Sequence, residues 1–225
     1  ASRVSFVKFV YDRVAFLYDE VCAVYSLGAI ARSKRHHLGF LRVGSRVLYV
    51  GVGRGADALA AARAGAQVTA VDLSEPMLRR LRAAAIREGL CLELVEDDVS
   101  QLPCPGDYDV VVANYFLNMF SESDAQSMLG ALLVQVRPGG RLCLADFAPA
   151  AGLGLSGVAT TAYYRLVNGV GWLLGICALH EIPDLPKWLT DRGLEILDIK
   201  RFPVMGGSGP AYWAMIARRP RVGLP

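Results

Sequence analysis

Short apolar segments alternate with segments of helical character between residues 46 and 145. The run Arg46-Val-Leu-Tyr-Val-Gly51 is typical: it carries a charge only at its first residue, is rich in valine and ends in glycine, as buried strands do. Strands that alternate with helices form a parallel sheet with helices on both faces. The strands expected in this core are residues 46–51, 67–71, 91–95, 108–113 and 141–145.

Helix start and stop signals lie between these strands. An alanine-rich helix follows Gly55 and ends at Gly65, because glycine readily adopts the left-handed conformation that ends a helix. Ser74 is expected at the start of a second helix and Gly89 at its end. Ser121 is followed three residues later by an aspartate, which predicts the start of a third helix in the manner of a capping box.

The two ends of the chain extend this core into one α/β domain. We expect a single Rossmann-like, doubly wound sheet of seven strands with the last strand antiparallel, in which 194–204 and 211–217 supply the last two strands. The domain over 1–225 is expected to divide into N-terminal helices at 1–42, a core at 45–146, a helical lid insertion after strand five at 147–182, and a closing helix and strands at 183–225.

Composition and charge exclude several classes of protein. The chain has 225 residues, 53% of them hydrophobic and 20% charged, which excludes intrinsic disorder. The net charge of +3 is too small for a protein that binds a phosphate backbone, so nucleic acid is not expected as a partner. The most apolar stretch, 166–179, has 14 residues and is too short to span a membrane. Five cysteines without a C-x-x-C pair indicate reduced thiols and a cytoplasmic protein.

A nucleotide-binding loop is indicated between the first strand and the helix that follows it. Gly51, Gly53 and Gly55 allow a tight turn and the close approach of a ligand to the backbone, beside the free N–H groups of a helix N-terminus. Asp72 follows 21 residues after Gly51, at the end of the next strand, where a carboxylate can accept both hydroxyls of a ribose. A plain turn for the glycines and a helix-cap partner for Asp72 are the alternative interpretations.

The loop alone does not identify the cofactor, since Gly51-x-Gly53-x-x-Ala56 also satisfies the relaxed pattern of nicotinamide-dependent dehydrogenases. Three later segments carry the distinction: Glu96-Asp-Asp-Val-Ser-Gln-Leu-Pro103, Tyr108-Asp-Val-Val-Val-Ala-Asn114 and Arg137-Pro-Gly-Gly140. With the loop, they make residues 45–146 resemble the class I S-adenosylmethionine-dependent methyltransferases, of the branch that includes the ubiquinone/menaquinone C-methyltransferases. Outside this core, Tyr11-Asp-x-x-Ala-x-x-Tyr18-Asp resembles the first helix of the same branch.

The resemblance implies that S-adenosylmethionine is the cofactor. In the family pattern, Asp72 matches the acid that binds the ribose, and Asp98 matches the acceptor for the adenine amino group. The cofactor-binding residues that the resemblance implies are Tyr49, Gly51, Gly53, Gly55, Asp72, Leu73, Met77, Asp98, Val99 and Asn114.

One position departs from the family pattern. The family has an acid in strand one that helps to hold the methionine ammonium, whereas this chain has Tyr49, and a phenol cannot supply a carboxylate's charge. We expect the phenol to point at the same pocket. The alternatives are that backbone carbonyls around Gly51 and Asn114 hold the ammonium, that cofactor affinity is weaker, or that the site does something other than ordinary methyl transfer. Arg54 either engages the methionine carboxylate or is a solvated loop residue.

The acceptor side of the site is expected beyond the carboxyl ends of the strands. His180 and Tyr18 are the expected catalytic residues, because an imidazole that titrates near neutral pH suits deprotonation of a phenol or an enol. A hydrogen-bonded structural role is the alternative for His180. His36 and His37 follow basic residues and are expected on a solvated face, and no metal-ligand spacing is present. The residues expected to line the substrate pocket are Tyr11, Tyr115, Asp146, Tyr164 and Trp172.

The expected function is transfer of a methyl group from S-adenosylmethionine to a small, lipophilic or aromatic acceptor through an O-, C- or N-nucleophile. The lid at 147–182 is expected to be mobile and apolar, because its glycines lower helix stability while its aromatics need cover. Two alternatives stay open: a repurposed or non-catalytic fold that binds S-adenosylmethionine, and an NAD(P)-dependent oxidoreductase. The expected partner is a small molecule, the expected state is a monomer or homodimer, and peripheral contact with a membrane stays open.

Overall fold

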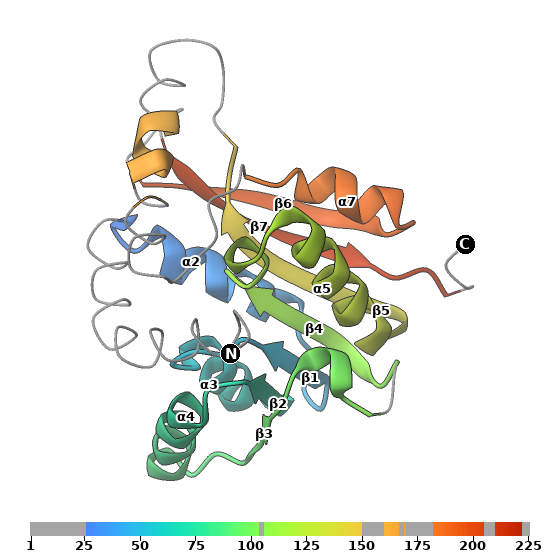
Figure 1. Ribbon diagram of the computed structural model, residues 1–225. Coiled ribbons are helices and arrows are strands. Elements are labelled where there is room, and N and C mark those ends of the chain that lie inside the picture. The colour runs from blue at the N-terminus through green and yellow to red at the C-terminus, as the bar shows by residue number, and fades with distance from the viewer. Residues whose placement is uncertain are drawn as a thin grey trace, which may run out of the picture.

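A seven-stranded sheet forms the centre of the computed structural model (Figure 1), and its strand order is β3-β2-β1-β4-β5-β7-β6. The structure describes residues 26–103, 106–149, 160–166, 169, 182–204 and 210–221. Strands β1 to β5 run parallel, and β7 runs antiparallel to both of its neighbours, which confirms the expected fold class. The strands are β1 (Arg46–Val50), β2 (Gln67–Asp72), β3 (Leu92–Glu96), β4 (Tyr108–Asn114), β5 (Val136–Phe147), β6 (Glu195–Pro203) and β7 (Ala211–Arg218).

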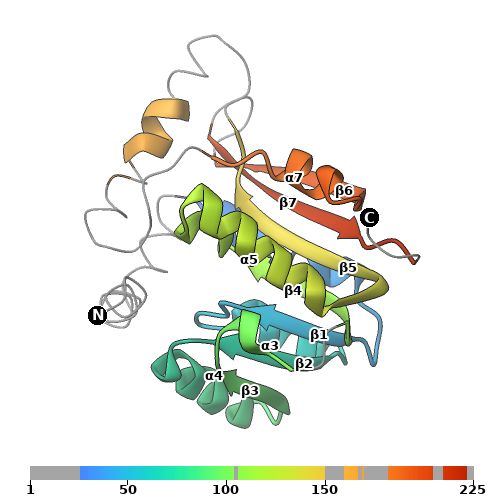
Figure 2. The same ribbon diagram turned by 45° about the vertical axis from the view of Figure 1, so that its right-hand side comes forward.

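Helices cover both faces of the sheet, as the alternating sequence predicts. Figures 1 and 2 both show α5 lying over β4 and β5, and α7 contacts β6. Ser121 begins α5, and its hydroxyl accepts a hydrogen bond from the backbone N–H of Asp124 at 3.3 Å, as the capping pattern predicts. The helices are α2 (Ala29–Arg35), α3 (Ala56–Arg63), α4 (Glu75–Arg87), α5 (Glu122–Gln135) and α7 (Leu185–Asp191), with short 3-10 helices η1 (His36–Phe40), η2 (Val99–Gln101) and η3 (Leu117–Met119).

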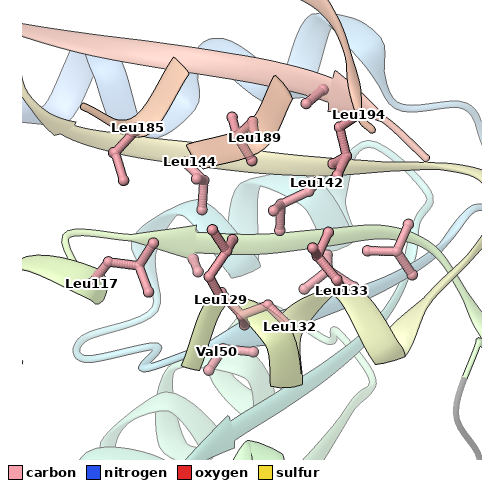
Figure 3. Close-up of a cluster of buried hydrophobic side chains, with 14 of the residues drawn as sticks. Val50, Leu117, Leu129, Leu132, Leu133, Leu142, Leu144, Leu185, Leu189 and Leu194 are labelled. Carbon is pink, nitrogen blue, oxygen red and sulfur yellow. The ribbon is translucent and has the colours of Figure 1, made fainter. Parts of the chain in front are cut away.

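Strand β1 divides the core between these two faces. Its side chains alternate, so that Leu48 and Val50 pack with α5 and α7, while Val47 and Tyr49 pack with α3 and α4. Figure 3 shows the first of these clusters, in which leucines from α5 and α7 meet leucines from the strands. Burial of such side chains is the main source of stability in a domain of this type. The sheet is therefore a rigid support for the loops that follow its strands.

The sheet places the ends of two strands where a ligand is expected. Strand β1 pairs with β2 on one side and with β4 on the other. The connection from β1 to β2 and the connection from β4 to β5 therefore run in opposite directions along the sheet, and the strand order reverses between β1 and β4. In open α/β sheets, ligands bind beyond the carboxyl ends of the strands at such a point. Gly51 follows β1 and Asn114 ends β4, so both lie at this position.

Two differences from the sequence predictions concern strand ends. Strand β5 begins at Val136, earlier than the residue 141 expected, because Tyr108 of β4 pairs with Val136 before the register shifts. It also continues to Phe147, so Asp146 lies within the strand and not after it. Within the described ranges, no helix is long and apolar enough to cross a membrane. The division of the chain at 147–182 stays a prediction, because most of that segment lies outside the described residues.

Candidate functional site

The loop after β1 carries three glycines, and each has a backbone conformation that favours glycine. Gly51, Gly53 and Gly55 have φ values of 63°, 53° and 69°, which side chains with a Cβ atom rarely adopt. Space is also restricted: a Cβ atom at Gly51 would lie 2.7 Å from the ring of Phe116, and one at Gly55 would lie 2.6 Å from Leu81. All three glycines therefore serve backbone conformation, and Gly51 and Gly55 also allow close packing against Phe116 and against Leu81 of α4.

Asp72 connects this loop to the start of α4. Its Oδ2 accepts a hydrogen bond from the backbone N–H of Gly53 at 3.1 Å, and its Oδ1 accepts one from Ser74 at 2.9 Å. The carboxylate is only partly buried. The geometry combines the helix-cap role, one of the two sequence interpretations, with a position that a ribose could reach.

Asp98 lies two residues beyond the end of β3, whose last residue, Glu96, pairs with Asp72. Its Oδ1 accepts a hydrogen bond from the backbone N–H of Ser100 at 2.8 Å, so it begins the short helix η2. Val99 and Met77 are buried in the core, whereas Leu73 is 39% exposed. The structure thus brings Asp72 and Asp98 to the ends of neighbouring strands, as the predicted site requires.

Tyr49 lies inside the protein, and its hydroxyl is held by protein groups. The hydroxyl oxygen lies 2.5 Å from Nε2 of His37 and donates to the backbone carbonyl of Asp57 at 3.2 Å. Tyr49 is 2% exposed and belongs to the cluster that packs with α3 and α4. Burial raises the pKa of this phenol, which stays neutral. These contacts favour a supporting role for Tyr49 over direct contact with a cofactor.

The expectation that His36 and His37 lie on a solvated face was wrong. His37 is 3% exposed and packs edge-on against Tyr49. His36 forms a hydrogen bond with the Asp198 carboxylate of β6 and packs against Phe40. Burial lowers the pKa of His37 to about 4, although the Asp57 carboxylate and a hydrogen bond to the backbone at Lys34 act in the opposite direction. His37 is therefore neutral at physiological pH.

This buried histidine predicts a loss of stability in mild acid. The folded-state pKa of about 4 lies below the 6.5 of an ordinary histidine, so between these values the unfolded chain binds a proton that the folded chain does not. We therefore expect His37 to lower the free energy of unfolding by about 1 kcal/mol when the pH falls from 7 to 5.5. Denaturant unfolding at both pH values should show this loss, and His37→Gln should reduce it. An unchanged pH dependence in His37→Gln would contradict the assignment.

Asp57 is a site residue that the sequence analysis did not identify. It is the second residue of α3 and is 8% exposed. Its Oδ2 accepts a hydrogen bond from the side-chain amide of Asn114 at 2.7 Å, and the same amide donates to the carbonyl of Lys34 at 3.2 Å. A lone aspartate early in an alanine-rich helix reads as an ordinary helix-start residue. Only the approach of Asn114 from β4 reveals its position.

Tyr115 follows β4 in a backbone conformation that is rare for a residue with a side chain. Its φ is 55°, and such residues cluster at functional sites. Its hydroxyl lies 2.8 Å from the hydroxyl of Ser33, and its ring packs edge-on against Phe147 and Tyr212. The ammonium of Lys34 lies 5.6 Å from the ring centroid. An aromatic group therefore stands beside the carboxyl ends of β4 and β5.

Two other residues expected in the substrate pocket are buried. Tyr164 is 4% exposed, and its hydroxyl donates to the carbonyl of Ala211 at 2.5 Å and accepts from the N–H of that residue at 2.9 Å. Asp146 is 2% exposed and accepts a hydrogen bond from the backbone N–H of Phe147 at 2.8 Å. Tyr164 thus links its helical segment to β7. The remaining expected residues, Tyr11, Tyr18, Trp172 and His180, lie outside the described residues, as does most of the lid.

A cavity of about 240 Å³ lies at the other end of the sheet. Ser45 and Asp109 place it at the amino ends of β1 and β4, whereas the glycine loop follows the carboxyl end of β1. Asp109 pairs with Arg137 at 2.6 Å within it. This cavity is therefore separate from the candidate site. Its lining residues are Arg42, Ser45, Asp109, Val110, Arg137, Gly139, Arg141, Arg218 and Arg221.

Comparison with known proteins agrees with this fold and loop. Residues 47–140 match the model of a family described as a methyltransferase domain. The chain is 32% identical over 144 residues to a demethylmenaquinone methyltransferase of Thermus thermophilus, covering 62% of this chain and 64% of the relative. It is 30% identical over 166 residues to a ubiquinone biosynthesis O-methyltransferase of Xanthomonas euvesicatoria, covering 69% of this chain and 65% of the relative. The chain thus spans less than two thirds of the length of these curated relatives.

Solved structures share the fold over nearly the whole chain. The magnesium protoporphyrin IX methyltransferase of Synechocystis with bound S-adenosylhomocysteine has a TM-score of 0.70 at 21% identity, covering 97% of this chain and 100% of that one. The 1,6-didemethyltoxoflavin-N1-methyltransferase of Burkholderia thailandensis has a TM-score of 0.66 at 22% identity, covering 98% of this chain and 91% of that one.

The doubly wound sheet, the glycine loop and the acid after β2 define a Rossmann-like methyltransferase domain. Residues 47–140 match a methyltransferase domain, and the relatives named as demethylmenaquinone and ubiquinone methyltransferases support a class I S-adenosylmethionine-dependent methyltransferase of the quinone methyltransferase branch. The resemblance expected from the sequence is thereby confirmed.

Proposed function

We propose that this protein binds S-adenosylmethionine beyond the carboxyl ends of β1 to β4 and transfers its methyl group to a small acceptor. The observation that carries the proposal is Asp72, which holds the glycine loop through Gly53 and the start of α4 through Ser74. A carboxylate placed at the end of β2 can accept the ribose hydroxyls of a nucleoside. Asp98 follows the neighbouring strand β3, which ends at Glu96, and its position at the start of η2 suits the adenine.

Methyl transfer requires the protein mainly to align the reacting atoms. The sulfonium of S-adenosylmethionine activates the methyl group, so the enzyme must hold the acceptor nucleophile in line with the methyl carbon and the sulfur. A general base is needed only where the acceptor must lose a proton, and His180 and Tyr18 stay the predicted candidates. The exclusion of water by a lid over residues 147–182 also stays a prediction.

An aromatic or lipophilic acceptor is favoured by two kinds of support. Tyr115, at the carboxyl end of β4, belongs to a cluster of aromatic rings with Phe147 and Tyr212. Related proteins are named as methyltransferases of quinone biosynthesis, and structural neighbours as methyltransferases of a porphyrin and of 1,6-didemethyltoxoflavin. We therefore propose a small ring system as the acceptor class.

A product screen tests this function. We expect S-adenosylmethionine with a labelled methyl group to label at least one member of a panel of quinols, phenols and nitrogen heterocycles, with S-adenosylhomocysteine as the second product. Calorimetry should show binding of S-adenosylmethionine and none of NADH. Binding of NADH alone would contradict the proposal and favour an oxidoreductase. Binding of S-adenosylmethionine without transfer to any member of the panel would favour a repurposed fold.

A further inference from the structure

A buried carboxylate without a cationic partner lies at the start of α3. Asp57 is 8% exposed, its Oδ2 accepts from the Asn114 amide at 2.7 Å, and its Oδ1 lies 3.2 Å from the N–H of Ala58. Among the residues that the structure describes, no Lys, Arg or protonated His pairs with it. Buried carboxylates are normally paired with a cation or neutralised, because removing a charge from water is costly.

The neighbours of Asp57 cannot supply the missing charge. His37 is the nearest titratable base in this cluster, and its pKa of about 4 leaves it neutral at physiological pH. Tyr49 donates its hydroxyl hydrogen to the backbone carbonyl of Asp57 and not to the carboxylate. The positive end of the α3 helix dipole can offset only a part of the charge of a carboxylate. Among the described residues, the Asp57 carboxylate therefore has hydrogen-bond donors but no cationic partner.

The position of this charge identifies the kind of partner it suits. Asn114 ends β4 and contacts Asp57 directly, and the glycine loop that begins at Gly51 leads into α3. Asp57 therefore lies where the order of the sheet reverses, beside the loop expected to bind the nucleotide. Asp72 stands at the end of β2 on the other side of β1. A ligand that places its ribose at Asp72 can extend its other end towards β4, where Asp57 lies.

We propose that the Asp57 carboxylate binds the amino-acid ammonium group of S-adenosylmethionine, an inference that rests on the proposed function. The carboxylate comes from the helix after the glycine loop, while position 49 of β1 holds an uncharged tyrosine. Tyr49 and His37 act as positioning residues: the phenol donates to the main chain of Asp57, and the imidazole holds the phenol. Asn114 orients the carboxylate by its amide.

This role predicts effects of opposite sign on stability and on binding. Asp57→Asn keeps the shape of the side chain and a carbonyl oxygen for the Asn114 amide, but it removes the charge without a partner. The free variant should melt at the same temperature as the wild type or higher, because a buried charge is lost. A purely structural aspartate would give a lower melting temperature instead.

Calorimetry with three ligands tests the proposal. S-Adenosylhomocysteine carries the ammonium, its desamino analogue lacks only that group, and 5′-methylthioadenosine lacks the whole amino-acid part. Asp57→Asn should weaken binding of S-adenosylhomocysteine at least tenfold and change binding of the other two less than twofold. Asp191→Asn, an exposed change on α7, is the matched control and should leave all three affinities unchanged.

Each outcome separates this inference from the proposed function. A wild-type protein that binds none of the three ligands contradicts the proposed function itself. If the wild type binds them and Asp57→Asn loses affinity equally for all three, or for none, the assignment of Asp57 is overturned while the function stands. If Asp57→Asn does not fold, the wild type still decides: equal affinity for S-adenosylhomocysteine and its desamino analogue would overturn the assignment.

Discussion

Asp72→Ala is expected to weaken binding of S-adenosylmethionine by about 1.5–3 kcal/mol, the usual loss for a hydrogen bond to a charged group. The carboxylate has two tasks in this geometry. It accepts the backbone N–H groups of Gly53 and Ser74, which keeps the loop after β1 against the start of α4. In the proposed site it also accepts the ribose hydroxyls. Alanine removes both, so affinity falls through the lost contact and through a less ordered loop.

The measurement is calorimetric titration of the folded variant with S-adenosylmethionine. Asp191→Ala removes an exposed carboxylate from α7, where it pairs with Lys187, and serves as the control with unchanged affinity. Asp72→Asn separates the two tasks, since the amide oxygen can still accept one backbone N–H while the charge is gone. Unchanged affinity in a folded Asp72→Ala variant would refute the ribose role and leave Asp72 as a helix-cap partner.

Most of the fold could be predicted because it depends on local patterns. Valine-rich runs such as 46–51 are apolar on both sides, so they are stable as strands buried within a sheet. Because these runs alternate with helices, a parallel sheet covered by helices is the stable arrangement. Ser121 and Gly55 mark helix starts by their own chemistry, and the structure places both at helix N-termini. The start of β5 at Val136 was missed because its pairing with Tyr108 crosses a register shift that no local pattern contains.

The candidate site could be predicted only where a single loop carries the information. The glycines after β1 and Asp72 are positioned by strand ends, so spacing along the chain is sufficient. His37 was misplaced because Arg32, Lys34 and Arg35 precede it, which makes the segment look solvated. Its burial comes from packing against Tyr49, which is set by tertiary structure.

The departure at Tyr49 has a physical explanation in its partners. A tyrosine in a buried strand must find hydrogen bonds for its hydroxyl, and His37 and the carbonyl of Asp57 provide them. The exchange of an acid for a phenol at position 49 is therefore coupled to His37, 12 residues earlier, and to Asp57, 8 residues later. Sequence spacing alone does not show such a coupling, because a helix start and a preceding 3-10 helix must meet on one strand.

Gly55→Ala is expected to lower the free energy of unfolding by about 2–5 kcal/mol. Gly55 has a φ of 69°, and a side chain in this left-handed region costs about 1–2 kcal/mol. The added Cβ would also lie 2.6 Å and 2.9 Å from the two terminal carbons of Leu81. Leu81 is fully buried between α4 and the sheet, so it cannot turn away freely, and overpacking of this kind costs about 1–3 kcal/mol.

Gly89→Ala separates the two contributions to this loss. Gly89 has a φ of 64°, close to that of Gly55, but a Cβ atom there meets nothing within 4 Å. Denaturant unfolding of both variants therefore measures backbone strain alone at Gly89, about 1–2 kcal/mol, and strain plus close packing at Gly55. The larger loss at Gly55 reflects the close contact between the glycine loop and α4. Equal losses in the two variants would show that Leu81 repacks without a loss of free energy. The backbone conformation alone would then explain why position 55 is a glycine.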